Sequence, residues 1–451
     1  MERIKPRTLS GFMELLPERQ IQFDMMVEKL RGSFSLYGFT PLDTPIIESA
    51  EVLLAKGGGE TEKQVYRFMK GDNDLALRFD LTVPLAKYVA LNYGRLSFPF
   101  RRFQIGKVYR GERAQRGRFR EFYQADIDII GDGALDIIND AEILGVIYCS
   151  FNELGLKKFV IRINNRKALN GLFSLFDLTY NAAGIMNTID KIDKIGAAEV
   201  GGILVKDLGV DKNKADEILE LITCDARGEN PIEVLTKHEG KNEILDAGIQ
   251  ELRAVTKYLP ELGVPETHFA VDLTIARGLD YYTGTVYETV MTDHPEIGSI
   301  CSGGRYDNLA EYYTAKKLPG VGISIGLTRL FYVLEEQGYL NSELLTSPAD
   351  TLILPMTEDL KLAVSLATAL RDIGVRTYLN CEEKKFKAKV SYADKLGIPY
   401  VVFIGEDEIK EDRVTVKKLS TGEQVTTTPA KAIALIKDGI SILRGGTPIK
   451  G

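Results

Sequence analysis

The stretch from Arg95 to Glu121 concentrates positive charge in a chain that is acidic overall. It is rich in lysine and arginine, with Glu112 and Glu121 as its acids, whereas the whole chain carries a formal net charge of −7. Aromatic residues interleave with the basic ones, as in a strand–loop–strand with aromatic anchors. This pattern predicts a local anionic partner, although a solvated basic face gives the same pattern. The overall negative charge argues against binding of nucleic acid by bulk electrostatics.

Arg110 and Glu112 are spaced so that their side chains act together. Alternate residues of a strand face the same side, so both side chains are expected in one cleft. A structural salt bridge between them is the competing interpretation.

Three later stretches add groups that could serve the same cleft. Arg277, Tyr281 and Tyr282 lie on a turn that enters a strand-like segment. Residues 302–307 contain glycines, which suit a close approach between backbone and ligand. Arg329 lies in the first turns of a predicted helix that follows a strand of small residues.

Other site types are disfavoured by the sequence. The four cysteines are scattered and the three histidines lack metal-ligand spacing, so we predict a reducing compartment and no metal site in the chain. The glycine-rich stretches 56–61 and 320–326 fit neither a P-loop nor a dinucleotide fingerprint. Neither an apolar run of about 18 residues nor a secretory signal is found, which predicts a cytoplasmic protein with no membrane contact.

The helices and strands predicted to position these residues follow two different patterns along the chain. Helices are predicted at 18–37 and 138–153 and strands at 75–79, 105–110 and 122–130. Residues 38–47 hold two prolines, which predict an edge or interface strand. Beyond a linker, strands at 351–355, 375–379 and 400–404 alternate with helices at 358–373 and 386–396, which predicts a small parallel-type sheet covered by helices.

These patterns of predicted helices and strands divide the chain into five segments. We predict a first part of a catalytic domain, a helical insertion without chemical motifs, a second part of the catalytic domain, a linker, and a compact α/β module with a tail. Their limits are 1–168, 169–264, 265–336, 337–349 and 350–451.

Five stretches of the sequence resemble the motifs of one enzyme family, and they occur along the chain in the order of those motifs. Residues 110–112 resemble motif 2 of class II aminoacyl-tRNA synthetases, and residues 326–330 resemble their motif 3. Residues 38–45 are similar to motif 1, whose proline lies at a dimer interface. Residues 277–288 and 302–307 resemble the two signature stretches of histidyl-tRNA synthetases.

The resemblance implies both a fold and a reaction. The expected fold is an α+β catalytic domain with a mostly antiparallel sheet, a helical insertion, and a C-terminal α/β domain of the anticodon-binding type. The expected activity is that of a histidine–tRNA ligase. Histidine reacts with ATP to give histidyl-adenylate and pyrophosphate, and the histidine then passes to the 3′ end of its tRNA.

The resemblance also assigns ATP contacts. Arg110 is similar to the arginine that grips the α-phosphate, and Glu112 to the residue that reads the adenine amino group. Arg277 resembles an arginine that supplies charge at the α-phosphate from the other side and also borders the histidine. Arg329 resembles the arginine that holds the γ-phosphate. Arg110 and Arg277 are therefore the expected catalytic residues, and Mg²⁺ is expected with the ATP phosphates.

The histidine pocket and the tRNA contacts are assigned in the same way. Asp80 and Thr82 match the acid and threonine that bind the α-amino group. Gln124 matches the residue near the amino and carboxylate end, and Asp128, Tyr281 and Tyr282 match the groups that contact the imidazole. The basic loop expected along the tRNA acceptor stem contains Arg113, Gln115, Arg116 and Arg118. The family also implies a homodimer.

Two rival functions are compatible with parts of the pattern. A histidine-binding regulatory paralogue of ATP phosphoribosyltransferase shares the catalytic fold, but such proteins typically lack the anticodon domain and lose signature arginines. Here Arg110, Arg277 and Arg329 are all present, as is the module at 350–436. A plain RNA-binding scaffold would not require these arginines beside a polar pocket.

Overall fold

The computed structural model describes residues 3–55, 60–113, 117–276, 281–340, 346–382 and 385–444. The chain divides into two compact units. The first unit comprises Met1–Glu14 and Met26–Tyr339, and the second comprises Leu15–Met25 and Leu340–Gly451. Within the described part of the chain, every helix is too short or too polar to cross a membrane.

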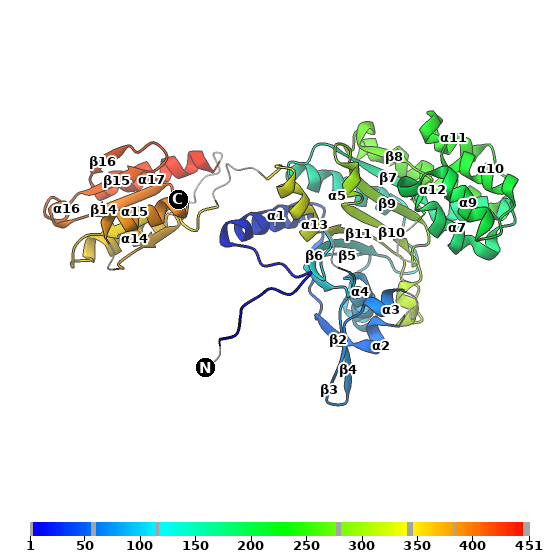
Figure 1. The fold of residues 1–451 in the computed structure, drawn as a ribbon, viewed down its shortest axis with the longest axis horizontal. Helices are drawn as coiled ribbons and strands as arrows, with labels where there is room; N and C mark the ends of the chain where they lie inside the picture. The colour runs from blue at the N-terminus through cyan, green and yellow to red at the C-terminus, as the bar shows by residue number, and fades with distance from the viewer. Residues whose placement is uncertain are drawn as a thin grey trace. The chain divides into compact units, whose positions relative to one another are not determined.

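The first unit is built on an eight-stranded sheet (Figure 1). In spatial order its strands are β1 (Thr40–Pro41), β5 (Phe100–Tyr109), β6 (Glu121–Ile130), β11 (Gly320–Gly326), β10 (Cys301–Tyr306), β9 (Thr285–Met291), β7 (Phe159–Asn165) and β8 (Phe269–Val271). Only the two edge pairs, β1–β5 and β7–β8, are parallel. The sheet is therefore mostly antiparallel, as predicted, and the proline-bearing segment forms one of its edges.

Strand β6 shows how this sheet separates a core from a polar face. Ala125, Ile127 and Ile129 alternate along it and are fully buried. The residues between them are polar and face the opposite side, because the side chains of a strand alternate between its faces. Helix α5 (Ile138–Glu153) packs against β11, and helix α13 (Leu327–Glu336) packs against β6 and β11.

Between β7 and β8 the chain is helical, as predicted for the insertion (Figure 1). Its helices are α6 (Arg166–Leu175), α7 (Ala182–Ile189), α8 (Ile192–Ile195), α9 (Ala197–Lys206), α10 (Lys212–Ile222), α11 (Pro231–Thr236) and α12 (Glu243–Glu261). Asparagine caps begin three of them: the side chain of Asn165 accepts the N–H of Lys167 before α6, that of Asn230 accepts the N–H of Ile232 before α11, and that of Asn242 accepts the N–H of Ile244 before α12.

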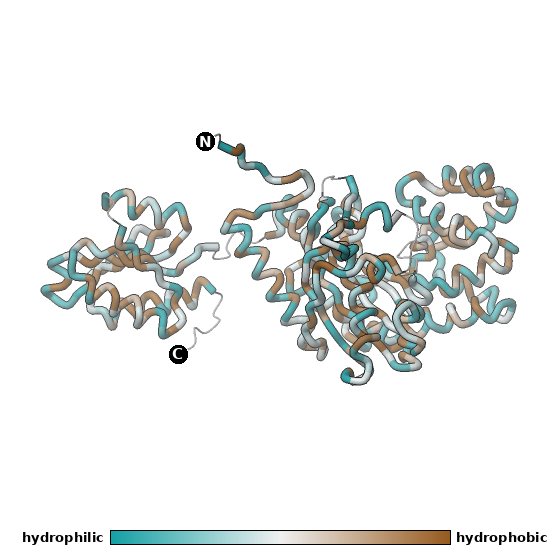
Figure 2. The backbone as a smooth tube through the Cα atoms, turned by 90° about the horizontal axis from the view of Figure 1, so that it is seen from below, coloured by the Kyte–Doolittle hydropathy of each residue, from teal (hydrophilic) through white to brown (hydrophobic). Residues whose placement is uncertain are grey.

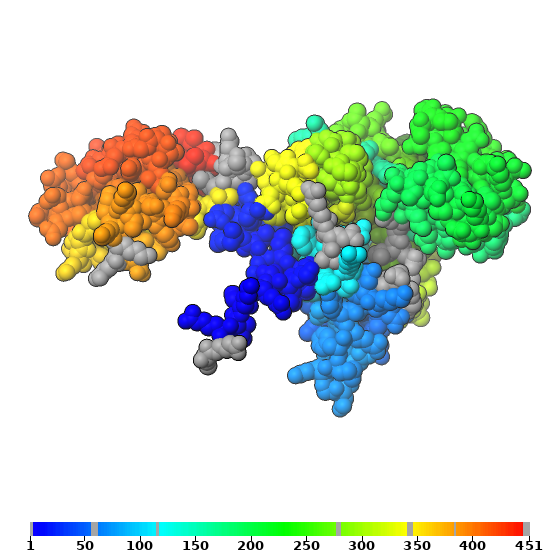
Figure 3. Space-filling view, in the orientation of Figure 1, coloured from blue at the N-terminus to red at the C-terminus, as the bar shows by residue number. Residues whose placement is uncertain are grey.

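A smaller sheet stands beside the polar face of the large one. It consists of β2 (Ile47–Ser49), β4 (Asn73–Leu77) and β3 (Arg67–Lys70), and the hairpin of β3 and β4 projects from the unit (Figures 1 and 3). Arg78 follows β4, is almost fully buried, and donates from Nε to the carbonyl of Lys107 at 2.7 Å. This bond ties the end of β4 to β5, and so fixes the start of α4 (Thr82–Asn92).

Three α-helices remain to be named, and residues of α1 belong to both units. They are α1 (Pro17–Leu36), α2 (Ala50–Leu53) and α3 (Glu60–Gln64).

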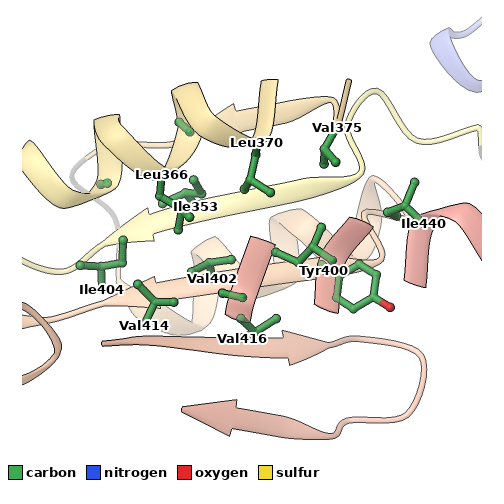
Figure 4. Packing of buried hydrophobic residues seen from close by; sticks show 14 residues of the cluster. Ile353, Leu366, Leu370, Val375, Tyr400, Val402, Ile404, Val414, Val416 and Ile440 are labelled. Atoms are coloured by element: carbon green, nitrogen blue, oxygen red, sulfur yellow. The ribbon is translucent and has the colours of Figure 1, made fainter. Parts of the chain in front are cut away.

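The second unit has its own five-stranded sheet. The strand order is β13 (Thr377–Leu379), β12 (Thr351–Pro355), β14 (Tyr400–Ile404), β15 (Val414–Lys418) and β16 (Gln424–Thr427). Its helices are α14 (Lys361–Asp372), α15 (Phe386–Lys395), α16 (Glu406–Lys410) and α17 (Pro429–Leu443). The first three strands are parallel, as predicted, but β15 and β16 extend the sheet in antiparallel fashion. Hydrophobic residues follow the inner strands (Figure 2) and pack against α14 and α17 (Figure 4).

Candidate active site

A cavity of about 450 Å³ in the first unit brings together most of the side chains that the sequence singled out. The predicted residues in its lining are Asp80, Thr82, Arg110, Glu112, Arg118, Gln124, Asp128, Tyr281, Tyr282 and Arg329. These residues come from β6, the start of α4, the segment after β5, the start of α13 and the segment before β9. Distant parts of the chain therefore converge as predicted.

Four predicted residues are not part of this observed lining. Arg113 is exposed and does not line the cavity. Arg277, Gln115 and Arg116 lie outside the described residues, so their roles stay predictions.

The floor of the cavity is made by alternate residues of neighbouring strands. Gln124 and Asp128 of β6 pair in register with Gly326 and Gly322 of β11. A Cβ at residue 322 would lie 2.2 Å from Oδ1 of Asp128, so only glycine leaves room for that carboxyl group. The small residues of β11 thus make space for the polar side chains of β6.

The glycines of β10 serve packing within the sheet. A Cβ at Gly303 would lie 2.2 Å from the carbonyl oxygen of Gly322, and a Cβ at Gly304 would lie 2.9 Å from the ring of Tyr282. The sequence predicted a close approach here between backbone and ligand. In the structure, the backbone of β10 at these glycines is instead approached by the neighbouring strand β11 and by the ring of Tyr282.

Asp128 is buried and already paired within the protein. Tyr306 donates its hydroxyl to Oδ1 at 2.5 Å, and Nη2 of Arg102 lies 2.6 Å from Oδ2. Burial raises the pKa of the Asp128 carboxyl, and the charge of Arg102 and the Tyr306 hydrogen bond oppose this rise. Neither Tyr306 nor Arg102 was predicted as a site residue. Tyr306 lies in one of the signature stretches, which was the available signal.

Asp126 is a second buried carboxyl group in the cavity that sequence reasoning missed. It is 2% exposed, and it shares the floor with Gln124 and Asp128. Burial raises its pKa to about 7, and Asp128 adds to the rise while Arg102 opposes it. The signal was present in the sequence, because polar residues occupy three successive alternate positions of one strand.

Asp80 and the tyrosines form the wall above this floor. Asp80 accepts the backbone N–H of Val83 at 3.0 Å in the first turn of α4, and burial raises its pKa. The rings of Tyr281 and Tyr282 meet edge to face with centroids 5.0 Å apart, and Tyr281 meets Tyr306 in the same way at 5.7 Å. Burial raises the pKa of both Tyr281 and Tyr282, so each hydroxyl stays protonated and can donate.

Arg110 and Glu112 carry opposite charge at the other end of the cavity. Arg110 lies over the rings of Phe79 at 4.4 Å and Phe122 at 5.1 Å, and its Nε donates to the carbonyl of Phe79 at 3.3 Å. Burial lowers the pKa of Arg110, although a guanidinium group remains charged. The carboxylate of Glu112 lies 3.7 Å from Arg118.

Arg329 adds a second cation at this end. It lies in the first turn of α13 and donates to the backbone carbonyls of Ile297 and Ser299, the latter at 3.1 Å. The start of the helix is fixed by Thr328, whose hydroxyl accepts the backbone N–H of Tyr123 at 2.8 Å. One cavity therefore combines a cationic end with a buried floor of carboxyl and hydroxyl groups.

No metal ion has an obvious place among these side chains. Across the described ranges, His, Cys, Asp and Glu form no group of three or more that could hold a metal ion.

Comparison with known proteins places this cavity in a family. The family described as histidyl-tRNA synthetase matches residues 11–330, and the anticodon-binding domain family matches residues 350–439. A histidine–tRNA ligase from Clostridium tetani is 52% identical over 435 residues, which cover 96% of this chain and 99% of that protein. One from Xanthomonas campestris pv. campestris (strain 8004) is 47% identical and covers 93% of this chain and 94% of its own length.

Solved structures agree with these matches. The histidyl-tRNA synthetase of Nostoc sp. PCC 7120 superposes with a TM-score of 0.87 at 38% identity, covering 97% of this chain and all of that one. A Bacillus halodurans structure described as an ATP phosphoribosyltransferase regulatory subunit/histidyl-tRNA synthetase has a TM-score of 0.72 at 20% identity, which shows the fold alone.

The fold and the matched families together define the class of protein as an aminoacyl-tRNA synthetase. Within that class, the chain belongs to the histidyl-tRNA synthetase family. The predicted fold class, family and enzyme class are therefore confirmed.

Proposed function

We propose that this cavity performs both steps of histidine–tRNA ligation. In the first step the histidine carboxylate attacks the α-phosphorus of ATP, which releases pyrophosphate and leaves histidyl-adenylate. In the second step the terminal ribose hydroxyl of the tRNA attacks the adenylate carbonyl and releases AMP. The observation that carries this proposal is the single cavity in which a cationic end adjoins a buried polar floor.

The first step needs positioning and charge neutralisation rather than a side-chain base, because the carboxylate is already a nucleophile. Arg110, fixed between two phenylalanine rings, binds the α-phosphate. Glu112 reads the adenine amino group, and Arg329 at the start of α13 binds the γ-phosphate. Arg277 supplies charge at the α-phosphate from the opposite side. Mg²⁺ enters with ATP and is held by phosphate oxygens.

The polar floor and walls receive histidine. Asp80 and Thr82 bind the α-amino group, and Gln124 lies near the amino and carboxylate end. Asp128, Tyr281 and Tyr282 border the imidazole. Sites that hydrogen-bond a substrate reject analogues lacking those groups by roughly 10⁴ to 10⁵. Such a pocket selects histidine without an editing step.

The tRNA contacts more than the cavity. The basic loop with Arg113, Gln115, Arg116 and Arg118 follows the acceptor stem through phosphate contacts, which position the tRNA. The C-terminal unit, matched by the anticodon-binding domain family, contacts the anticodon arm. The protein acts in the cytoplasm as a homodimer that uses the edge strand at residues 38–45.

The segment limits stay as proposed from the sequence. They are catalytic parts at 1–168 and 265–336, the insertion at 169–264, the linker at 337–349 and the C-terminal domain with its tail at 350–451.

Amino-acid-dependent exchange of radiolabelled pyrophosphate into ATP tests this function. The purified protein should catalyse exchange with histidine and not with the other nineteen amino acids. Exchange that depends on a different amino acid would refute the proposal, as would the absence of any exchange from a protein that is folded and binds ATP.

A further inference from the structure

The segment that carries Tyr281 and Tyr282 lies just before β9, and these two residues belong to neither a helix nor a strand. Both line the cavity, and a Cβ at Gly304 would lie 2.9 Å from the ring of Tyr282. Side chains on a loop are held less precisely than side chains on a strand, so the two rings need an anchor in the surrounding protein. The residue that provides it is the next one along the chain, Thr283.

Thr283 is joined to β10 and to the residue that follows this strand by hydrogen bonds of its backbone and its side chain. Its backbone N–H donates to the carbonyl of Arg305 at 2.8 Å. Its hydroxyl donates to Oδ2 of Asp307 at 2.6 Å and accepts the backbone N–H of Asp307 at 3.1 Å. The hydroxyl therefore acts as donor and acceptor at once, which a methyl group cannot do.

This contact continues the pairing of β9 with β10. The register pairs Val286 with Gly304, and three residues further along the same ladder it sets Thr283 opposite Asp307. Side chains directly opposite each other on antiparallel strands lie close enough to interact. The pair of Thr283 and Asp307 thus extends the ladder beyond the two strands and holds the tyrosine segment on β10.

Strand β10 is itself anchored in the core. Arg305 forms a buried ion pair with Asp140 of α5, in which Nη2 lies 2.5 Å from Oδ2. A Cβ at Gly284 would lie 3.0 Å from Cδ of Arg305, so the tyrosine segment also packs closely on this side chain. Thr283 and Asp307 are both described by the structure, and neither lines the cavity. Any effect of this pair on a ligand therefore passes through the tyrosines beside it.

We propose that Thr283 and Asp307 are positioning residues that hold the rings of Tyr281 and Tyr282 in place for histidine. This inference rests on the proposed histidine–tRNA ligation and deepens it, because it assigns part of the affinity for histidine to a hydrogen-bonded pair outside the cavity. The cationic end of the cavity is built on other elements, the segment after β5 and the start of α13. Its geometry is therefore independent of the pair.

Thr283→Val tests the pair because valine has nearly the shape of threonine but lacks the hydroxyl. In histidine-dependent pyrophosphate exchange, KM for histidine should rise about 10- to 100-fold, because small misplacements of a site are costly, while KM for ATP stays unchanged. Thr283→Ser restores the hydroxyl and should return KM for histidine to the wild-type value. A KM that stays raised in Thr283→Ser would assign the effect to the methyl group and overturn the proposal.

Thr256→Val in α12 is the matched control. Thr256 is half-buried, as Thr283 is, and donates its hydroxyl to the carbonyl of Leu252 at 2.8 Å. Loss of this hydroxyl should leave KM for histidine unchanged, because α12 does not carry the tyrosines. A thermal melt of each variant separates a displaced ring from a loss of folding.

Asp307→Ala removes the other half of the pair at a side chain that is 25% exposed, so the fold should tolerate the change. It should raise KM for histidine as Thr283→Val does, and it carries the comparison alone if Thr283→Val does not fold. The double variant should have a KM no higher than that of the weaker single variant, because both changes break one contact. Single effects that multiply in the double variant would show two independent residues and overturn the proposal.

Two further results would also overturn it. An unchanged KM for histidine in both Thr283→Val and Asp307→Ala would show that the pair does not position the rings. An equal rise of KM for histidine and KM for ATP would indicate a general disturbance of the cavity. Each of these results requires wild-type exchange with histidine, whereas failure of the proposed function removes histidine-dependent exchange from the wild-type protein itself.

Discussion

Strands β6 and β14 are both buried over most of their length, yet their side chains have different roles. In β14, alternate residues enter two separate hydrophobic cores: Val402 and Ile404 face one (Figure 4), and Val401 and Phe403 face the other. In β6, one face is equally apolar, but the other holds carboxyl and amide groups beneath a cavity. Burial alone therefore does not separate a core from a site. The chemistry of every second residue does.

The same contrast separates stability from activity. A methylene group removed from β14 leaves a void in a close-packed interior, and the free energy of unfolding falls. The polar face of β6 is instead partly unsatisfied, since burial raises the pKa of Asp126 and its Oδ1 has no hydrogen-bond partner among the residues that the structure describes. We infer that this face gives up some stability in the free protein to bind its substrate.

The largest expected effect concerns the pH dependence of stability at Asp126. Its pKa is raised in the folded protein to about 7, above the value of about 4 for an unfolded aspartate. The folded state thus binds more protons between these values, and the contribution of Asp126 to stability is lost as pH rises from about 4 to 7. Asp126→Asn should gain stability relative to the wild-type protein over this window, by up to about 4 kcal/mol.

Denaturant unfolding across this pH range measures the difference between the two proteins. Replacement of an exposed residue that does not titrate, as in Ile442→Val, is the control and should give a difference that does not vary over the same window. A constant difference for Asp126→Asn as well would remove the contrast between the two strands.

The next effect concerns the cationic end of the cavity. Arg110→Ala should lower the rate of histidine-dependent pyrophosphate exchange by about 10² to 10³, by analogy with loss of one oxyanion donor. Arg227→Ala, which alters an exposed arginine of the helical insertion, is the matched control and should retain the wild-type rate. An Arg110 variant with the wild-type rate would exclude this residue from the reaction.

The smallest effect compares apolar positions in the two strands. Ile404→Val in β14 and Ile127→Val on the apolar face of β6 should each lower the free energy of unfolding by about 0.5–1.5 kcal/mol, because each deletes one buried methylene group. Ile442→Val, at a largely exposed position, should have no measurable effect. If Ile404→Val lost exchange activity but kept a normal melting temperature, the assignment of β14 to stability and of β6 to activity would be contradicted.

The sequence predicted much of the framework because its patterns are local. Helix 138–153 and strands 351–355 and 400–404 were predicted with the bounds that the structure shows. Strands β15 and β16 were missed, since they end in lysines and polar residues. Only the antiparallel pairing of β15 with β14 and of β16 with β15 gives them a place in the sheet.

The site was predicted to a similar degree and for a similar reason. The family resemblance predicted Arg110, Asp128 and Arg329 at one site, and all three line the same cavity. It did not name Asp126, whose hydrogen-bond partner Ser324 comes from the neighbouring strand β11. Which buried oxygen is left for a ligand is a property of the assembled sheet.

A crystal structure of the protein with histidine and a non-hydrolysable ATP analogue tests the central claim most directly. We predict the imidazole against the polar face of β6 and the α-phosphate beside the guanidinium of Arg110. Histidine bound outside the cavity, or phosphates remote from Arg110, would contradict the account of a single cavity that joins the two substrates.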